Sequence, residues 1–136
     1  MPALRLANRS PAAAAALAGE LAALGRPVAA VPWSEREAAM AEVALVVNCT
    51  SLGMIGQPPL ELALDRLPPA AVVADLVYVP LETPLLAAAR ARGHVAVDGL
   101  GMLLHQAVPG FTHWGGVVPT VDDELREVML AAVTNR

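Results

Sequence analysis

The sequence predicts an α/β protein with a parallel sheet, and three observations support this. Short aliphatic runs alternate with Ala- and Leu-rich stretches that carry helix-capping residues, as strands and crossover helices do in parallel sheets. Aromatic residues make up only 3% of the 136 residues, which disfavours an all-β sandwich. The run 44–47 is apolar at every position, so we expect a strand that is covered on both faces.

The first third of the chain gives clear start and stop signals. Ser10 is a good N-cap and Pro11 suits a first helical position, so a helix is expected at 11–24, ending at Gly25. Ser34–Glu37 has the pattern of a capping box and predicts a short helix. Strands are expected at residues 4–7, 28–31 and 44–47.

The remaining elements follow a long, turn-rich loop at 48–59. Thr83 and Pro84 predict the start of a helix that Gly93 closes. Strands are expected at 71–76 and 95–97, and helices near 60–66, at 84–92, from after Met102 to about 108, and from Asp122 onward. The last helix is expected to carry one apolar stripe, formed by Leu125, Val128, Met129 and Ala132.

Composition excludes several classes of function. The net charge is −4 and no basic stripe is present, so nucleic acid is not an expected partner. Asp75 and Glu82 interrupt the best apolar run, so no membrane span is expected. The single cysteine, Cys49, excludes a disulfide framework, fits a reducing, cytoplasmic compartment, and is interpreted as a small buried filler. The histidines lack ligand spacing, so no metal site is expected.

The polar islands of the sequence follow the predicted strands. They are "NRS" after the first strand, "NCTS" after the third, and "DLVY" and "DGLGM" after the last two. Ligands of open parallel sheets bind at the carboxyl ends of the strands, so this arrangement predicts a ligand site in these loops.

Arg9 lies in the first of these loops, directly before a helix start. Its guanidinium fork matches phosphate oxygens, and the helix N-terminus adds partial positive charge. In a dinucleotide-binding fold an arginine here would accept the 2′-phosphate of NADP. The alternative is an ordinary Ser-Pro helix cap with a solvated arginine, and "LANRS" alone favours the alternative.

The other loops also admit two interpretations. Thr50 and Ser51 could line a cofactor, or could form a simple Asx/Ser turn after Asn48. Tyr78 could hold a polar substrate, or could be a packed ring with an exposed hydroxyl. "DGLGM" does not match the Gly-x-Gly-x-x-Gly fingerprint of dinucleotide sites.

Taken in order, "NRS", "NCTSLGM", "DLVYVPLETPLL" and "DGLGMLLHQA" resemble the shikimate dehydrogenase family, which reduces 3-dehydroshikimate with NADPH. The resemblance extends from Leu4 to the last helix. It implies a three-layer, Rossmann-like parallel sheet that is incomplete, because the first strand and the Gly-rich phosphate loop are missing. Residues 1–136 would then be a partial NADP-binding domain plus a C-terminal helix, without the N-terminal substrate domain.

The resemblance also implies roles for individual residues. NADP would be held through its 2′-phosphate and adenine by Asn8, Arg9 and Ser10, lined by Thr50 and Ser51, and contacted at the nicotinamide by Leu76, Gly99 and Met102. Shikimate or 3-dehydroshikimate would contact Tyr78 and Gln106. Gly99 and Gly101 would let backbone approach the nicotinamide, and Gln106 would turn inward from a buried helix.

The sequence departs from the family pattern at two places. The first helical turn usually carries a second basic residue, and Ala13 stands there. The family's catalytic Lys–Asp pair belongs to the N-terminal domain, and this chain contains no lysine: all nine basic residues are arginine. The missing central strand is expected to leave an unfilled slot or an exposed strand edge.

These departures leave more than one hypothesis. The leading one is the NADP-binding portion of a shikimate dehydrogenase-like oxidoreductase of chorismate biosynthesis, without catalytic residues of its own and inactive alone. An alternative is a non-catalytic assembly module that completes a separately encoded N-terminal half or pairs with a second copy as a homodimer. A further alternative is a quinate/shikimate dehydrogenase with relaxed cofactor choice.

Overall fold

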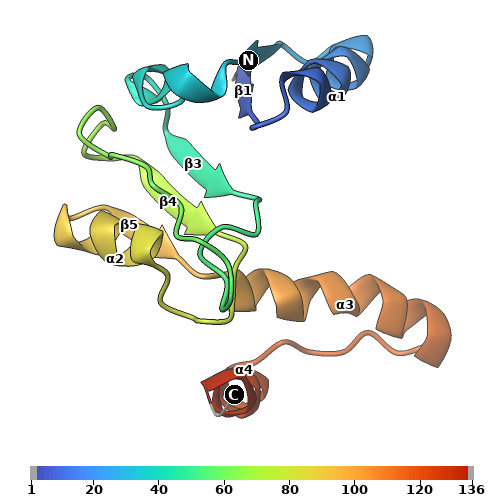
Figure 1. The fold of residues 1–136 in the computed structure, drawn as a ribbon. Helices are drawn as coiled ribbons and strands as arrows, with labels where there is room; N and C mark the ends of the chain where they lie inside the picture. Colours follow the sequence, from blue (N-terminus) through green and yellow to red (C-terminus); the bar gives the residue numbers. More distant parts are fainter. Residues whose placement is uncertain (1–2, 135–136) are drawn as a thin grey trace. The chain divides into compact units, whose positions relative to one another are not determined.

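The computed structural model describes residues 3–134, which divide into two compact units. The first unit contains the residues up to Val43 together with Ala63–Pro68, and the second contains Ala44–Leu62 and the residues from Pro69 onward. The strands pair in parallel in both units, and each unit contains one crossover in which a helix connects two parallel strands (Figure 1). The predicted parallel α/β class is therefore confirmed.

The first unit is a strand–helix–strand crossover. β1 (Leu4–Ala7) pairs with β2 (Val28–Val31), and α1 (Pro11–Ala23) connects them. The Ser10 hydroxyl accepts a hydrogen bond from the Ala13 N–H at 3.3 Å, so this predicted cap is confirmed. After α1, Gly25 has a φ of 74°, a conformation that glycine adopts without strain.

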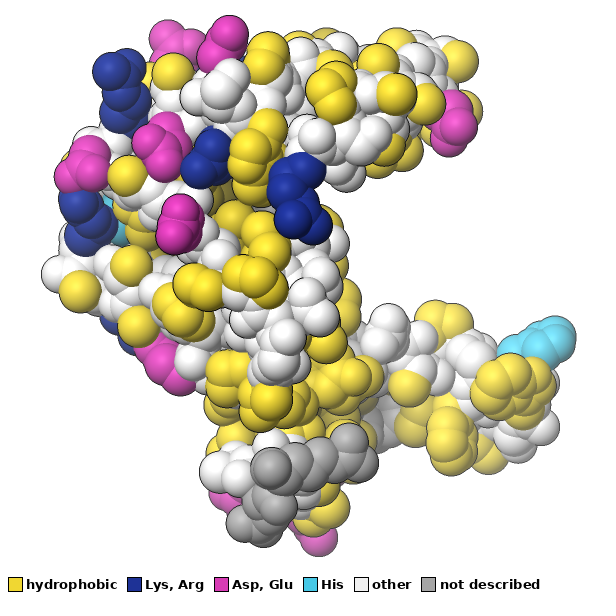
Figure 2. Space-filling view, in the orientation of Figure 1, with side chains coloured by type: hydrophobic (Ala, Val, Ile, Leu, Met, Phe, Trp, Pro, Cys, Tyr) yellow, Lys and Arg dark blue, Asp and Glu magenta, His cyan; other side chains and the backbone are white. Residues whose placement is uncertain are grey.

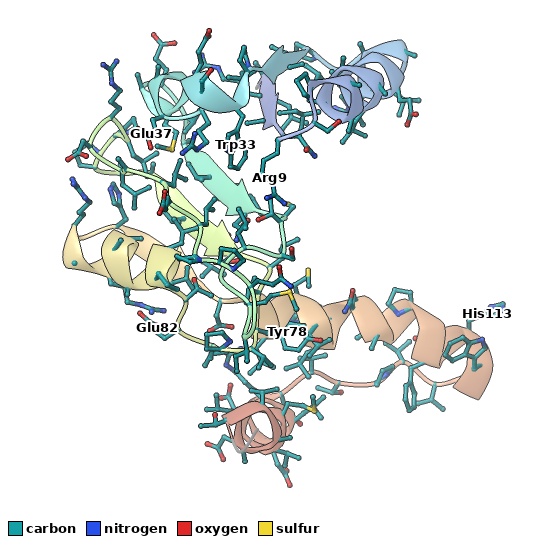
Figure 3. The ribbon with its side chains drawn as sticks, viewed as in Figure 1. Arg9, Trp33, Glu37, Tyr78, Glu82 and His113 are labelled. Atoms are coloured by element: carbon teal, nitrogen blue, oxygen red, sulfur yellow. The ribbon has the colours of Figure 1, made fainter. Side chains whose placement is uncertain are left out.

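The predicted capping box at 34–37 is wrong. Two short 3₁₀ helices, η1 (Trp33–Glu35) and η2 (Ala38–Met40), occupy this region, and neither has a side-chain cap. The Glu37 carboxylate accepts a hydrogen bond from the backbone N–H of Ala63 at 3.1 Å. Figure 3 labels Glu37 on this segment. The Glu37 carboxylate, which a capping box would use, is therefore bound to a backbone group 26 residues away in sequence.

The predicted helix at 60–66 is also wrong, because this segment forms irregular structure and a turn. It lies between the proline pairs 58–59 and 68–69, which leaves little room for a helix to nucleate. The Ala63 N–H is bound by Glu37 rather than by a helical carbonyl. Leu64 and Leu67 are nevertheless buried, so the segment anchors itself through apolar side chains.

The second unit is built on a three-stranded parallel sheet. In sheet order its strands are β3 (Leu45–Asn48), β4 (Val72–Asp75) and β5 (Val95–Val97). α2 (Pro84–Ala91) packs against β4 and β5, and the Thr83 hydroxyl caps its start. Val73, Leu86 and Leu100 are fully buried and form the centre of this core.

β3 is less covered than its sequence suggests. Leu45 and Val47 are 53% and 42% exposed, so the prediction of a strand covered on both faces is wrong. Among the strands described here, β3 pairs only with β4, and it therefore keeps one unpaired edge. An edge of this kind agrees with the expected consequence of a missing neighbour strand.

α3 (Gly99–Gly115) is longer than predicted at both ends. Asp98 is its N-cap, with Oδ1 accepting the Leu100 N–H at 3.0 Å, so the glycines of "DGLGM" lie inside the first turn. The helix continues past Pro109 to Gly116, which has a φ of 69°. Apolar side chains lie at the surface over the outer end of α3 (Figure 2). Within residues 3–134 no helix combines the length and apolar character that crossing a membrane requires.

α4 (Asp123–Thr134) begins as predicted, because Asp122 Oδ1 accepts the Leu125 N–H at 2.9 Å. Its predicted stripe is only partly right, since Val128 is 61% exposed. The half-covered face consists instead of Arg126, Met129, Leu130 and Val133. Arg126 donates to Asp98 Oδ2 at 2.8 Å, and this ion pair ties α4 to the start of α3.

Candidate functional site

The first group of predicted site residues, Asn8 to Ser10, lies in the first unit at the carboxyl end of β1. The Asn8 side chain accepts the Ser10 N–H at 2.8 Å, and Ser10 then caps α1. Arg9 lies at the apex of this turn and is exposed (Figure 3). It makes no ion pair with any side chain of residues 3–134. Its guanidinium is therefore available to an anionic ligand.

The second unit has a hollow of about 280 Å³ at the carboxyl ends of its strands. The loop after β3 and the loop after β4 line it, through Thr50, Met54, Leu76, Val77, Tyr78 and Val79. Two backbone hydrogen bonds hold these loops together: Leu76 N–H to Asn48 O at 3.0 Å and Ile55 N–H to Val79 O at 3.2 Å. Of the predicted site residues, Thr50, Leu76 and Tyr78 thus share one hollow, whereas Ser51 is exposed outside its lining.

A buried polar cluster underlies this hollow. Asn48 and Asp75 are opposite each other in the β3–β4 register, and both are almost fully buried, as is Thr83. Asn48 Nδ2 donates to Asp75 Oδ1 at 2.9 Å, and Thr83 Oγ1 donates to Asp75 Oδ2 at 2.7 Å. No local sequence pattern predicted this cluster. The available signal was that Asn48 and Asp75 each end a strand of the same parallel sheet.

Gly99 allows α3 to start directly against the loop after β4. A Cβ built on Gly99 would lie 2.6 Å from the Leu76 carbonyl carbon and 2.8 Å from the Val77 carbonyl oxygen. The close approach at Gly99 is therefore to the protein's own loop. A Cβ built on Gly101 would meet no atom within 4 Å, so no other part of the described chain approaches Gly101 closely.

Met102 and Gln106 follow on α3. The buried residues of this helix are Gly99, Leu100 and Leu104, and both Met102 and Gln106 are exposed. The expectation that Gln106 turns inward from a buried helix is therefore wrong for the described chain. The physical reason is that the buried residues of α3 end at Leu104, so a polar residue beyond it needs no buried partner.

Cys49 is exposed, so its interpretation as a buried filler is wrong. Side chains alternate between the two faces at a strand end, and the buried neighbour Asn48 takes the inward position. The sulfur is still partly covered. This partial burial raises the pKa of the Cys49 thiol, and the negative charge of Asp75 raises it further.

The raised pKa predicts slow alkylation of Cys49 at neutral pH. The thiolate is the reactive form, so the iodoacetamide rate should rise with pH at a midpoint above that of an unfolded peptide containing the same residues. Since the unfolded thiol ionises first, the stability contributed by this group is present at neutral pH and declines as pH rises through the folded-state pKa. A midpoint equal to that of the unfolded peptide would contradict this.

The histidines lie apart from the hollow. His94 is buried at the start of β5, and His105 and His113 are exposed on α3. Within the described range, 3–134, no three His, Cys, Asp or Glu side chains come together as metal ligands could.

Comparison with known proteins shows which proteins this chain is similar to. No family model matches the chain. It is, however, 62% identical over 126 residues to a protein of Acidiphilium cryptum named shikimate dehydrogenase (NADP(+)), and 57% identical over 130 residues to the protein of that name in Rhodospirillum rubrum. The chain is homologous to the shikimate dehydrogenases. The matches cover 93% and 95% of this chain but 44% and 46% of those relatives, so the chain spans about half their length.

Solved structures of shikimate dehydrogenases and a related enzyme share the fold. A quinate dehydrogenase from Corynebacterium glutamicum in complex with NAD matches with a TM-score of 0.84 and 38% identity, over 94% of this chain and 46% of its own. A shikimate 5-dehydrogenase from Thermus thermophilus, in complex with NADP(H) and shikimate, matches with a TM-score of 0.73 and 31% identity, over 96% and 45%. The predicted Rossmann-like α/β fold, present in part, is thereby confirmed.

Proposed function

We propose that this chain is the NADP-binding, carboxyl-terminal portion of a shikimate dehydrogenase-type oxidoreductase. The observation that carries the proposal is the homology to shikimate dehydrogenases named for NADP(+) over more than nine-tenths of the chain. The match to about half of each relative supports the view that the chain supplies one of two functional parts.

The residues at the strand ends fit such a cofactor. Arg9, which forms no ion pair with the side chains of residues 3–134, offers its guanidinium beside a helix start, which suits a phosphate at the 2′ position of the adenosine. The hollow lined by the loops after β3 and β4 is mostly apolar, and two of its lining residues, Thr50 and Tyr78, carry hydroxyls, which suits a flat ring and its ribose. Asn8 and Ser10, Ser51, and Gly99 and Met102 would complete the cofactor contacts, whereas Tyr78 and Gln106 would face the substrate.

The cofactor, when bound, supplies the hydride that reduces the ring ketone of 3-dehydroshikimate. The chain's own residues would orient and shield the nicotinamide: Leu76, which lines the hollow, and Gly99, which packs against the Leu76 backbone, would form the wall, and the Tyr78 hydroxyl would bind a substrate oxygen. The chain contains no lysine, and no acid–base pair lines the hollow. We therefore propose that the isolated chain binds cofactor without turning over substrate, and that a partner domain supplies the proton transfer.

Arg9→Ala should weaken NADP binding while NAD binding stays nearly unchanged, because only NADP carries the 2′-phosphate. Loss of a hydrogen bond to a charged group predicts a loss of affinity of about 10- to 100-fold. Calorimetric titration of the chain with each cofactor measures this. Arg26→Ala is the matched control, since Arg26 is an exposed arginine at the opposite end of the same two-stranded sheet. Equal losses for NADP and NAD would contradict the assignment.

Ala13→Arg should have the opposite effect. Ala13 is exposed in the first turn of α1, where a longer basic side chain adds a second charged donor without displacing packed atoms. We expect NADP affinity to rise about tenfold with no change for NAD. Ala13→Met, which adds length without charge, should leave both affinities unchanged. A gain with methionine, or none with arginine, would contradict the placement of the phosphate.

A second candidate function rests on the unpaired edge of β3. An edge that carries exposed Leu45 and Val47 can accept a further strand from a separately encoded N-terminal half or from a second copy. Mixing the chain with the N-terminal half of a shikimate dehydrogenase should then restore NADPH-dependent reduction of 3-dehydroshikimate. Light scattering separates the self-paired form, which would have twice the chain's mass. A monomer that gains no activity on mixing would exclude this candidate.

A further inference from the structure

A buried carboxylate beneath the hollow has no cationic partner within the described range, 3–134. Asp75 is 1% exposed, and no arginine among residues 3–134 forms an ion pair with it. Burying a charge is unfavourable unless hydrogen bonds compensate, and three donors do so here. They are Asn48 Nδ2 at 2.9 Å, the Val77 N–H at 3.0 Å and Thr83 Oγ1 at 2.7 Å. An apolar residue at 75 would avoid the cost of burying a charge, so packing alone does not explain why a carboxylate is present there.

The carboxylate sets the direction of every hydrogen bond around it, because an ionised carboxyl group only accepts. The Thr83 hydroxyl must donate to Asp75, while its oxygen accepts the Leu86 N–H at 3.3 Å. The Asn48 amide must turn its NH₂ toward Asp75, and the second N–H of that group goes to the Leu52 carbonyl at 3.1 Å. The orientation of the Asn48 side chain is thereby fixed.

The fixed amide of Asn48 in turn orients Thr50, which lines the hollow. Asn48 Oδ1 accepts both the Thr50 N–H, at 3.0 Å, and the Thr50 hydroxyl, at 2.8 Å. The Thr50 oxygen also accepts the Leu52 N–H at 3.1 Å. The only hydrogen on the Thr50 hydroxyl is therefore used inside the loop. The Thr50 side chain therefore offers the hollow only an oxygen lone pair, which accepts a hydrogen bond.

We propose that Asp75 is a positioning residue which, acting through Asn48, makes Thr50 present only an acceptor to the hollow and so selects a ligand group that donates a hydrogen bond. A hydroxyl or an amide NH₂ meets this requirement, whereas a phosphate oxygen does not. The inference rests on the proposed function only in taking a nicotinamide dinucleotide as the ligand, whose ribose hydroxyls and carboxamide are such donors.

Asp75→Leu tests the proposal because it keeps the branched shape of the side chain and removes both acceptor oxygens. An amide would not do so, because its oxygen could still accept from Asn48 Nδ2 and the Val77 N–H while its NH₂ faced Thr83. Without an acceptor at 75 the Asn48 amide is free to rotate, which turns NH₂ toward Thr50. We expect the Thr50 amide, which has then lost its acceptor, to exchange with deuterium at least about tenfold faster. NADP affinity should fall about tenfold.

Thr83→Val is the matched control for simple loss of structure. It removes one donor to Asp75 and the cap of α2, yet it leaves Asp75 an acceptor and Asn48 in place. It should lower the melting temperature, while the exchange of the Thr50 amide at low temperature and the NADP affinity both stay within about threefold of wild type. Thr83→Ser, which retains the hydroxyl, should resemble wild type in all three measurements.

A double-mutant comparison separates positioning from general destabilisation. Thr50→Val removes the oriented hydroxyl, so adding Asp75→Leu to it should weaken NADP binding by no more than about twofold further. The proposal is overturned if Asp75→Leu and Thr83→Val lower the melting temperature alike and neither changes Thr50 exchange, or if the losses of affinity multiply. If the wild-type chain binds no NADP, the proposed function fails, and the exchange of the Thr50 amide still decides whether Asp75 orients this loop.

Discussion

Gly99→Ala should destabilise the chain by about 3 kcal/mol, at the upper end of the range for overpacking in a close-packed site. The added methyl group would meet backbone atoms of Leu76 and Val77 at less than 3 Å, and backbone cannot rotate away as a side-chain end can. Either α3 or the loop after β4 must therefore shift. Because Leu76 and Val77 line the hollow, NADP binding should weaken together with stability.

Gly101→Ala is the control for this substitution. Both glycines lie in the first turn of α3, but a Cβ at Gly101 meets no atom within 4 Å. Alanine is the better helix former, so Gly101→Ala should stabilise the chain by about 0.5–1 kcal/mol. Urea denaturation followed by circular dichroism measures both variants. If Gly99→Ala is as stable as Gly101→Ala, the close packing of α3 on the loop is wrong.

Leu86→Ala should destabilise the second unit by about 2–5 kcal/mol. Leu86 is fully buried on α2, which packs against β4 and β5, so the substitution leaves a cavity at the centre of the core. Its backbone N–H is bonded to Thr83 and is unaffected by the change. A loss of this size is a large fraction of the stability of a small domain and should appear as a marked shift of the urea midpoint.

The matched control for the cavity is Ile55→Ala. It removes the same number of carbon atoms, but Ile55 is 67% exposed in a loop of the same unit. A surface substitution of this kind should change stability by no more than about 0.5 kcal/mol. Similar losses for Leu86→Ala and Ile55→Ala would contradict the assignment of the core.

Local sequence signals predicted those parts of the fold that depend on neighbouring residues. Ser10 and Thr83 each cap the helix that begins beside them, and the bounds of β2 agree with the predicted strand. The error at 34–37 arose because Glu37 binds a backbone group far along the chain, which no local pattern reveals. A local capping pattern fails to predict a helix when a distant backbone group binds the side chain that the cap would use.

The candidate site was predictable in location but not in its internal geometry. The rule that ligands bind at strand ends led to Thr50, Leu76 and Tyr78, which share one hollow. The role of Asp75 is inferred from the β3–β4 register and from the burial of its carboxylate, and neither can be read directly from the sequence. Gln106 was misplaced because its predicted burial assumed a helix packed along its whole length.

Backbone NMR of the chain, titrated with NADP and then with NAD, tests the central claim most directly. The account predicts saturable shift changes at two sets of amides, those of Asn8–Ser10 and those around Thr50, Leu76 and Gly99. The first set should respond more to NADP than to NAD. Saturable changes confined to other parts of the chain, or no response to either dinucleotide, would contradict the claim that the polar strand ends form the cofactor site.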